Sequence, residues 1–206
     1  ILITHLHGDH FFGCAGLCHS MSLLGRDKNL EIYGPSGTKK AIKKLLTAGE
    51  QRVNFSVEIK ELKPEQSLSF GKLIVKIASA DHTIPALAYR VETEQRPGKF
   101  NDAKADEIGL PKDPLRGKLV SGEEIEFEGQ IIKSDTLVGP SRKGLSLVYS
   151  GDSRASKEIE ILAQNVDLLI HEATLIDEDK AQEFGHSTPK DAAMLARKAK
   201  VGKLVL

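Results

Sequence analysis

Apolar and polar positions along the chain predict short strands separated by helices. Apolar runs of about four to eight residues, rich in β-branched side chains, are typical of buried strands. Such runs predict strands over residues 1–4, 30–33, 57–62, 73–79, 86–92, 145–149, 167–170 and 204–206. Because helical patterns separate several of these strands, the sequence predicts an α/β domain.

Helical patterns cover residues 11–24, 36–46, 154–164 and 188–200. Gly25 follows the first pattern, where a residue with left-handed backbone angles commonly ends a helix. Ser36 is expected to cap the second helix with its hydroxyl. Thr188 followed by Pro189 predicts the start of the last helix, because proline is favoured at the first helical position.

The stretch from Thr93 to Gly122 breaks this alternation. It has little periodicity, and between these two end residues it contains six Pro and Gly residues, at positions 97, 98, 109, 111, 114 and 117. Long segments without regular structure are uncommon in compact domains and are usually functional or disordered. We therefore expect a flexible arm over 93–122, inserted in a single domain that covers residues 1–206.

Composition places the chain among ordinary globular proteins. Apolar residues make up 40% and charged residues 28% of its 206 residues, and no apolar run approaches the roughly 20 residues of a membrane span. Lys and Arg number 29, as do Asp and Glu. A nucleic-acid partner would therefore have to bind a local basic patch rather than a generally basic surface.

Two cysteines, Cys14 and Cys18, are too few for a disulfide framework. On a helix they share one face, and His19 beside them raises the alternative of a metal clip. Two buried thiols that behave as small hydrophobic side chains are the favoured interpretation.

Both ends of the chain fall within strand-like apolar runs. It begins at Ile1 without Met and stops at Leu206. We interpret the sequence as a piece of a longer protein.

The strongest chemical signal directly follows the first predicted strand and reads His5-Leu6-His7-Gly8-Asp9-His10. Alternate residues of an extended segment point the same way, so His5 and His7 can bind one metal ion. Asp9 and His10, beyond the turn at Gly8, can serve a second ion. Imidazole nitrogen and carboxylate oxygen together suit zinc.

This hexapeptide resembles the H-x-H-x-D-H signature of the metallo-β-lactamase superfamily. The resemblance implies a four-layer αβ/βα sandwich with metals where strand ends meet. His82, after the strand that ends near Ser79, resembles the third ligand of the first metal site. Asp152 resembles the carboxylate that bridges both metals, although Ser153 stands where many members have Thr. A last ligand, a His, is expected beyond Leu206.

Two further motifs resemble the ribonuclease Z family. His171-Glu172-Ala173-Thr174 follows a predicted strand, and His186-Ser187-Thr188 precedes the last helix. The resemblance implies that Glu172 and His186 pair and pass a proton to the leaving oxygen. It also implies that the arm grips tRNA, and four basic residues are expected to contact the RNA: Arg96, Lys99, Arg116 and Lys118.

The resemblance implies a cytoplasmic, homodimeric endoribonuclease with two Zn²⁺ ions per subunit, Mn²⁺ being an alternative. Asp9 would orient the attacking water and take its proton. The expected reaction removes the 3′ trailer of precursor tRNA, leaving a 3′-hydroxyl on the tRNA and a 5′-phosphate on the trailer.

Two alternatives remain at this stage. One is a small-molecule phosphodiesterase or arylsulfatase on the same fold, which the arm disfavours because a small substrate needs no distant clamp. The other is a non-catalytic RNA-binding scaffold, which the complete set of predicted metal ligands disfavours.

Overall fold

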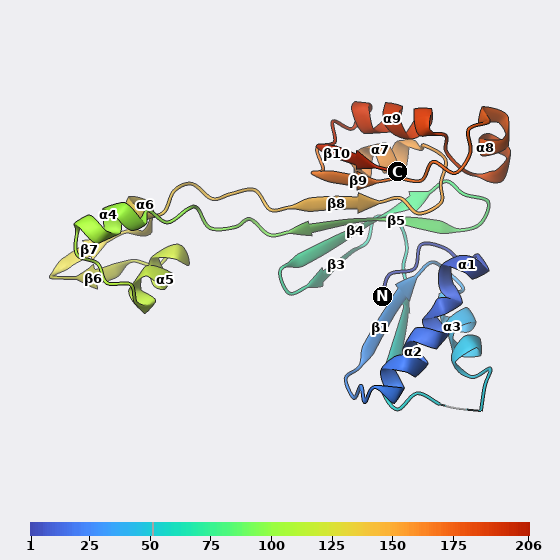
Figure 1. Cartoon of the computed structure of the whole chain (residues 1–206), viewed down its shortest axis with the longest axis horizontal. Coiled ribbons are helices and arrows are strands. Elements are labelled where there is room, and N and C mark those ends of the chain that lie inside the picture. Colours follow the sequence, from blue (N-terminus) through green and yellow to red (C-terminus); the bar gives the residue numbers. More distant parts are fainter. Residues whose placement is uncertain (51) are drawn as a thin grey trace. The chain divides into compact units, whose positions relative to one another are not determined.

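The structure, a computed structural model, describes residues 1–50 and 52–206. These residues form two compact units (Figure 1). The first unit consists of Ile1–Glu92 and Ser146–Leu206, and the second of Thr93–Leu145. Each unit has buried apolar side chains of its own. No helix in the described part of the chain combines the length and apolar character that a membrane crossing requires.

The first unit contains the expected alternation of strands and helices. Its helices are α1 (Gly8–Phe11), α2 (Gly13–Leu23), α3 (Thr38–Leu46), α7 (Lys157–Leu162), α8 (Glu178–Phe184) and α9 (Pro189–Lys198). Its strands are β1 (Leu30–Gly34), β2 (Val57–Glu61), β3 (Ser67–Phe70), β4 (Leu73–Ala80), β5 (Ala86–Thr93), β8 (Ser146–Tyr149), β9 (Leu168–Ile170) and β10 (Lys203–Val205).

These elements form four layers. One sheet has the strand order β10-β9-β8-β5-β4-β3, and β1 pairs with β2 in a second, parallel sheet. Helices α7 and α9 bury apolar side chains such as Ile159 and Leu195 against the first sheet. Tyr33 and Leu87 pack between the two sheets, and α2 and α3 cover the other side of β1. This αβ/βα arrangement is the predicted fold, and its strand ends carry the candidate site.

Most predicted elements are present, with two local differences. Residues 1–4 are extended, but within the described ranges they form a single bridge, between Leu2 and Tyr33. The predicted Ser36 cap is wrong, because Gly37 is the N-cap of α3 and no side chain caps it from that position. Instead the Glu61 carboxylate accepts hydrogen bonds from the backbone N–H groups of Gly37 and Lys39, both at 3.0 Å. Glu61, the last residue of β2, thus caps α3 in place of Ser36.

The cysteines lie on α2 as free thiols. Cys18 is fully buried among the apolar side chains under α2 and α3, and Cys14 is half-buried. Burial raises the pKa of both thiols, which keeps them protonated. Cys18 is thus the expected buried thiol, whereas Cys14 is more exposed than expected.

The second unit is more ordered and longer than the arm expected over 93–122. It contains α4 (Asp102–Glu107), α5 (Pro114–Val120), β6 (Ile125–Phe127), β7 (Gln130–Ile132) and α6 (Ser134–Leu137). Leu110, Leu119 and Leu137 are buried in its core. The boundary moves to Leu145 because the returning half of the chain supplies part of that core.

Two paired segments, 93–100 and 138–145, form one end of this unit. Backbone bridges join Arg96 to Arg142 and Phe100 to Val138. Glycine allows the close approach: a Cβ at Gly98 would lie 1.8 Å from the carbonyl oxygen of Gly139, and one at Gly144 2.0 Å from that of Thr93. The pairing therefore depends on both glycines.

Candidate metal centre

His5 is the most deeply buried residue of the site. It follows the extended run 1–4, and its side chain is fully buried. Its Nδ1 lies 3.0 Å from the Thr4 hydroxyl, while its Nε2 is buried with no hydrogen-bond partner among the described residues. Burial, and then the neighbouring His10, lower the pKa of His5 to about 4. The ring is therefore neutral at neutral pH, as a metal ligand must be.

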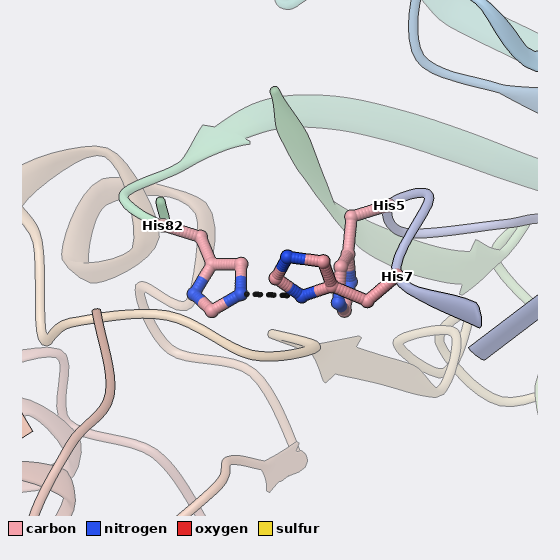
Figure 2. A group of neighbouring side chains, drawn as sticks. All are labelled: His5, His7 and His82. Atoms are coloured by element: carbon pink, nitrogen blue, oxygen red, sulfur yellow. Dashed lines mark hydrogen bonds between the residues drawn. The ribbon is translucent and has the colours of Figure 1, made fainter. Parts of the chain in front are cut away.

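His7 and His82 meet beside His5 (Figure 2). His7 Nδ1 lies 3.2 Å from His82 Nε2, and both rings lie about 5 Å from the His5 ring, each with a centroid separation of 4.9 Å. His82 Nδ1 lies 2.7 Å from the carbonyl oxygen of Gly185. A carbonyl can only accept, so this contact places the ring proton on Nδ1 and leaves the Nε2 lone pair for a metal.

His10 and Asp152 form a second group with His5. His10 Nε2 is 3.3 Å from Asp152 Oδ2, and His5 Nε2 is 3.9 Å from the same oxygen. Asp152 follows β8 and exposes 22% of its side chain. Asp9, at the start of α1, lies 3.3 Å from His10 but leaves 79% of its side chain exposed. Its carboxylate thus lies on the open side of the cluster.

Glu172 and His186 form a pair next to these ligands. His186 Nδ1 donates to Glu172 Oε1 at 2.8 Å, and the Glu172 side chain is only 9% exposed. Burial alone would raise the pKa of Glu172, but hydrogen bonds from Thr174, Ser153 and Ser187 outweigh it and hold that pKa below its usual value. The carboxylate is therefore ionised at neutral pH and accepts the hydrogen bond from His186. The ring centroids of His186 and His82 lie 5.2 Å apart.

The arrangement fits a metal site. His5, His7 and His82 offer ligand atoms within 4.8 Å of one another, and so do His5, His10 and Asp152. The unpartnered, buried Nε2 of His5 is costly unless something accepts its lone pair. Neutral imidazoles with one carboxylate are a donor set that zinc favours.

Comparison with known proteins gives the family. The model of the beta-lactamase superfamily domain matches residues 1–100. Ribonuclease Z of Archaeoglobus fulgidus is 40% identical over the whole chain, which covers 68% of that protein. The chain belongs to the ribonuclease Z family. Ribonuclease Z of Nitrosopumilus maritimus is 38% identical, with 70% of its length covered. The crystal structure of human tRNase Z, short form, covers the whole chain with a TM-score of 0.68 and 28% identity.

This chain spans about two thirds of the length of its ribonuclease Z relatives, between 65% and 70% for those at 38–40% identity. Within that span the structure brings the expected site residues together from separate loops. Two groups that share His5 contain five of them: His5, His7, His10, His82 and Asp152. Asp152 approaches His5 and His10, and its role as a bridge between two ions stays a prediction, as does that of Asp9.

Among the basic residues expected to bind RNA in this ribonuclease Z family member, Arg116 has a different role. It is 8% exposed, and its guanidinium donates to the Asp102 and Asp106 carboxylates and to the carbonyl oxygens of Pro111 and Leu110. With its donors used inside the second unit, Arg116 holds that unit together and is not available to a phosphate. The other three, Arg96, Lys99 and Lys118, have exposed side chains.

The residues that hold the candidate metal-binding side chains and Glu172 in place were not predicted from the sequence. The Ser153 amide donates to Glu172 Oε1 at 2.8 Å, and the Ser153 carbonyl accepts from the Ser187 hydroxyl at 2.7 Å. Gly185, with φ +77°, supplies the carbonyl that faces His82. A glycine directly before the motif histidine was the available signal, because it marks the end of α8.

Proposed function

We propose that this chain is the catalytic part of a zinc-dependent endoribonuclease that removes the 3′ trailer of precursor tRNA. The observation that carries the proposal is the Glu172–His186 pair beside the cluster of metal-binding side chains. Hydrolysis of a phosphodiester needs a group that protonates the departing oxygen, and an imidazole backed by a buried carboxylate is suited to that task.

His5, His7 and His82 would hold one zinc ion, and Asp9, His10 and Asp152 the other. When bound, the ions supply an acidified water and neutralise charge on the phosphoryl oxygens. The exposed Asp9 carboxylate would orient the attacking water and accept its proton. His186 would donate from Nε2 to the leaving oxygen while Glu172 stabilises the charged ring.

The second unit supplies a surface for the body of the tRNA. Thr93–Leu145 holds nine Lys and Arg against ten Asp and Glu, so it is not basic as a whole. The two paired segments, however, hold four of the nine basic residues and one of the ten acidic ones. Arg96 and Lys99 are exposed there, and phosphate contacts by such side chains give affinity without reading sequence.

The proposal is tested by mapping product ends. The full-length protein, loaded with Zn²⁺ or Mn²⁺, is incubated with 3′-extended precursor tRNA, with and without a chelator. We expect one chelator-sensitive cut after the discriminator base, leaving a tRNA 3′-hydroxyl and a trailer 5′-phosphate. His186→Ala should lose at least about 100-fold in rate, and Lys190→Ala, which alters an exposed ion pair with Glu178, should not.

A different result points elsewhere. Hydrolysis of a chromogenic phosphodiester without any cut in precursor tRNA would favour the small-molecule phosphodiesterase. Binding of tRNA without metal binding would favour the RNA-binding scaffold. The homodimer expected from the family resemblance is checked by light scattering on the same sample.

A further inference from the structure

Arg154 joins three loops that carry site residues. Its side chain is 21% exposed and lies two positions after Asp152. The guanidinium donates from Nη1 to Asp81 Oδ1 at 3.0 Å, and from Nε and Nη2 to the carbonyl oxygen of Gln182 at 2.8 and 2.5 Å. Its backbone N–H donates to the Asp81 carbonyl at 2.8 Å. One residue thus connects the Asp152 loop, the Asp81 loop and α8.

Both hydrogen-bond partners of the Arg154 side chain, Asp81 and Gln182, belong to segments that contact or contain His82. Asp81 is its direct neighbour in the chain. Gln182 lies in the last turn of α8, where carbonyl groups lack partners inside the helix and carry partial negative charge. That helix ends at Gly185, whose carbonyl accepts from His82 Nδ1 at 2.7 Å. Arg154 therefore fixes the backbone next to His82 and the helix end that sets the His82 ring orientation.

We propose that Arg154 is a positioning residue of the metal centre, which aims His82 Nε2 at the ion shared with His5 and His7. The inference rests on the metal centre of the proposed function, and adds a residue that touches neither metal nor substrate. Side chains that orient a metal-binding His typically change metal affinity by about 10- to 100-fold when they are removed. A solvent-exposed ion pair alone would contribute little, and Asp81 is 52% exposed.

The geometry also requires an arginine rather than any cation. A planar guanidinium can donate to Asp81 and, through two other N–H groups, to one carbonyl oxygen in a fixed direction. A lysine ammonium at the same position can neutralise Asp81 but cannot hold both partners in this geometry. Arg154→Lys should therefore restore only part of what Arg154→Met loses.

The test measures metal affinity and ring orientation in the full-length protein. Titration calorimetry with Zn²⁺ should show about 10- to 100-fold weaker binding for Arg154→Met, with an intermediate loss for Arg154→Lys. In metal-free protein, the NMR signal of the His82 Nδ1 proton, assigned by its absence in His82→Gln, should broaden or disappear in Arg154→Met. Lys157→Met is the matched control, because Lys157 is 66% exposed and its ion-pair partner in the described part of the chain is the neighbouring Glu160.

The NMR signal of the His82 Nδ1 proton tests the role of Arg154 independently of catalytic activity. An unchanged signal and unchanged Zn²⁺ affinity in Arg154→Met would overturn the proposal. If that variant does not fold, the same two readings on Arg154→Lys decide it. A parent protein that binds Zn²⁺ but does not cut precursor tRNA would refute the proposed function and leave the role of Arg154 intact.

Discussion

At the scale of single residues, the ionised Glu172 carboxylate fixes the orientation of the His186 ring. The carboxylate is nearly buried, yet it accepts hydrogen bonds from the N–H groups of Ser153 and Thr174 as well as from His186. These donors stabilise the ionised form against the cost of burial. The ionised Glu172 carboxylate accepts from His186 Nδ1 and thereby fixes the orientation of the imidazole ring.

Glu172→Gln should separate this role from metal binding. The amide keeps the size of the side chain but loses the charge, so the cleavage rate should fall by about 100-fold or more. Zn²⁺ affinity, measured by calorimetry, should stay within about twofold of the parent. Glu178→Gln is the control, since Glu178 is 64% exposed and pairs with Lys190.

A parallel loss of Zn²⁺ affinity would contradict this assignment. Glu172, His186 and Asp152 also offer ligand atoms within 4.8 Å of one another, so that result would make the carboxylate a metal ligand. The calorimetric titration thus separates a proton-transfer pair from a third metal-binding group.

At the scale of elements, the end of α8 matters more than its body. The helix buries only Ala181, so its seven residues contribute little to the core. Its last turn, in contrast, presents the Gly185 carbonyl to His82 and places His186 beside Glu172. A Cβ at Gly185 would lie 2.9 Å from His82 Nδ1, and φ there is +77°.

Gly185→Ala should therefore cost more than backbone strain alone. Gly71→Ala is the matched variant, because Gly71 also has a positive φ, +59°, but nothing within 4 Å of the added Cβ. We expect Gly71→Ala to lower the free energy of unfolding by about 1–2 kcal/mol. Gly185→Ala should lower it by at least about 1 kcal/mol more and weaken Zn²⁺ binding. If denaturant titrations gave the same loss of unfolding free energy for both variants, the His82 side chain would move away from the added methyl group at no cost.

The two paired segments of the second unit give a similar contrast. Gly98→Ala would place a methyl group against the Gly139 carbonyl, whereas Gly117→Ala, in α5, meets open space. The first change should separate the segments, and the second should stabilise α5 by roughly 1 kcal/mol. Limited proteolysis should cut within 93–145 faster in Gly98→Ala and no faster in Gly117→Ala. Equal rates of proteolysis in both variants would refute the close packing of Gly98 against Gly139.

Elements with a strong periodic pattern were predictable, and short polar ones were not. Thr188 caps α9 as predicted, and the Asp191 carboxylate, which was not predicted, accepts in return from the Thr188 backbone N–H. Strand β3 was overlooked because its four residues pair only with β4. Helix α8 was overlooked because it buries one side chain, which leaves no apolar stripe to detect.

At the scale of the whole molecule, the site combines residues that are close together in the sequence with residues that are far apart in it. His5, His7 and His10 lie within one hexapeptide, so their proximity was evident from sequence. His82 and Asp152 were predicted because they resemble ligand motifs of the superfamily, and each follows a strand. The hydrogen bonds of Arg154 and Gly185 depend on how α8 packs, which no local pattern encodes. The core of the second unit could not be predicted from sequence for the same reason, because Leu110 and Leu137 are far apart in the chain and come together only in the folded unit.

The second unit leaves and re-enters the first at a single point, which makes it removable. Glu92 of β5 and Ser146 of β8 are direct partners in an antiparallel pair. An Asn-Gly turn can join such partners with the twist that a hairpin needs. Because each unit buries its own apolar core, the protein without 93–145 should fold and bind Zn²⁺ like the parent.

That shortened protein tests whether the second unit serves only the large substrate. Hydrolysis of a chromogenic phosphodiester should stay within a fewfold of the parent, because no ligand of the metal centre is removed. The value of kcat/KM for precursor tRNA should fall by roughly 100-fold, equivalent to about 2.7 kcal/mol of lost binding. Equal losses on both substrates would mean that the unit supports the metal centre itself. No loss on precursor tRNA would remove Arg96 and Lys99 from the binding surface, and the RNA contacts would then have to lie in the first unit.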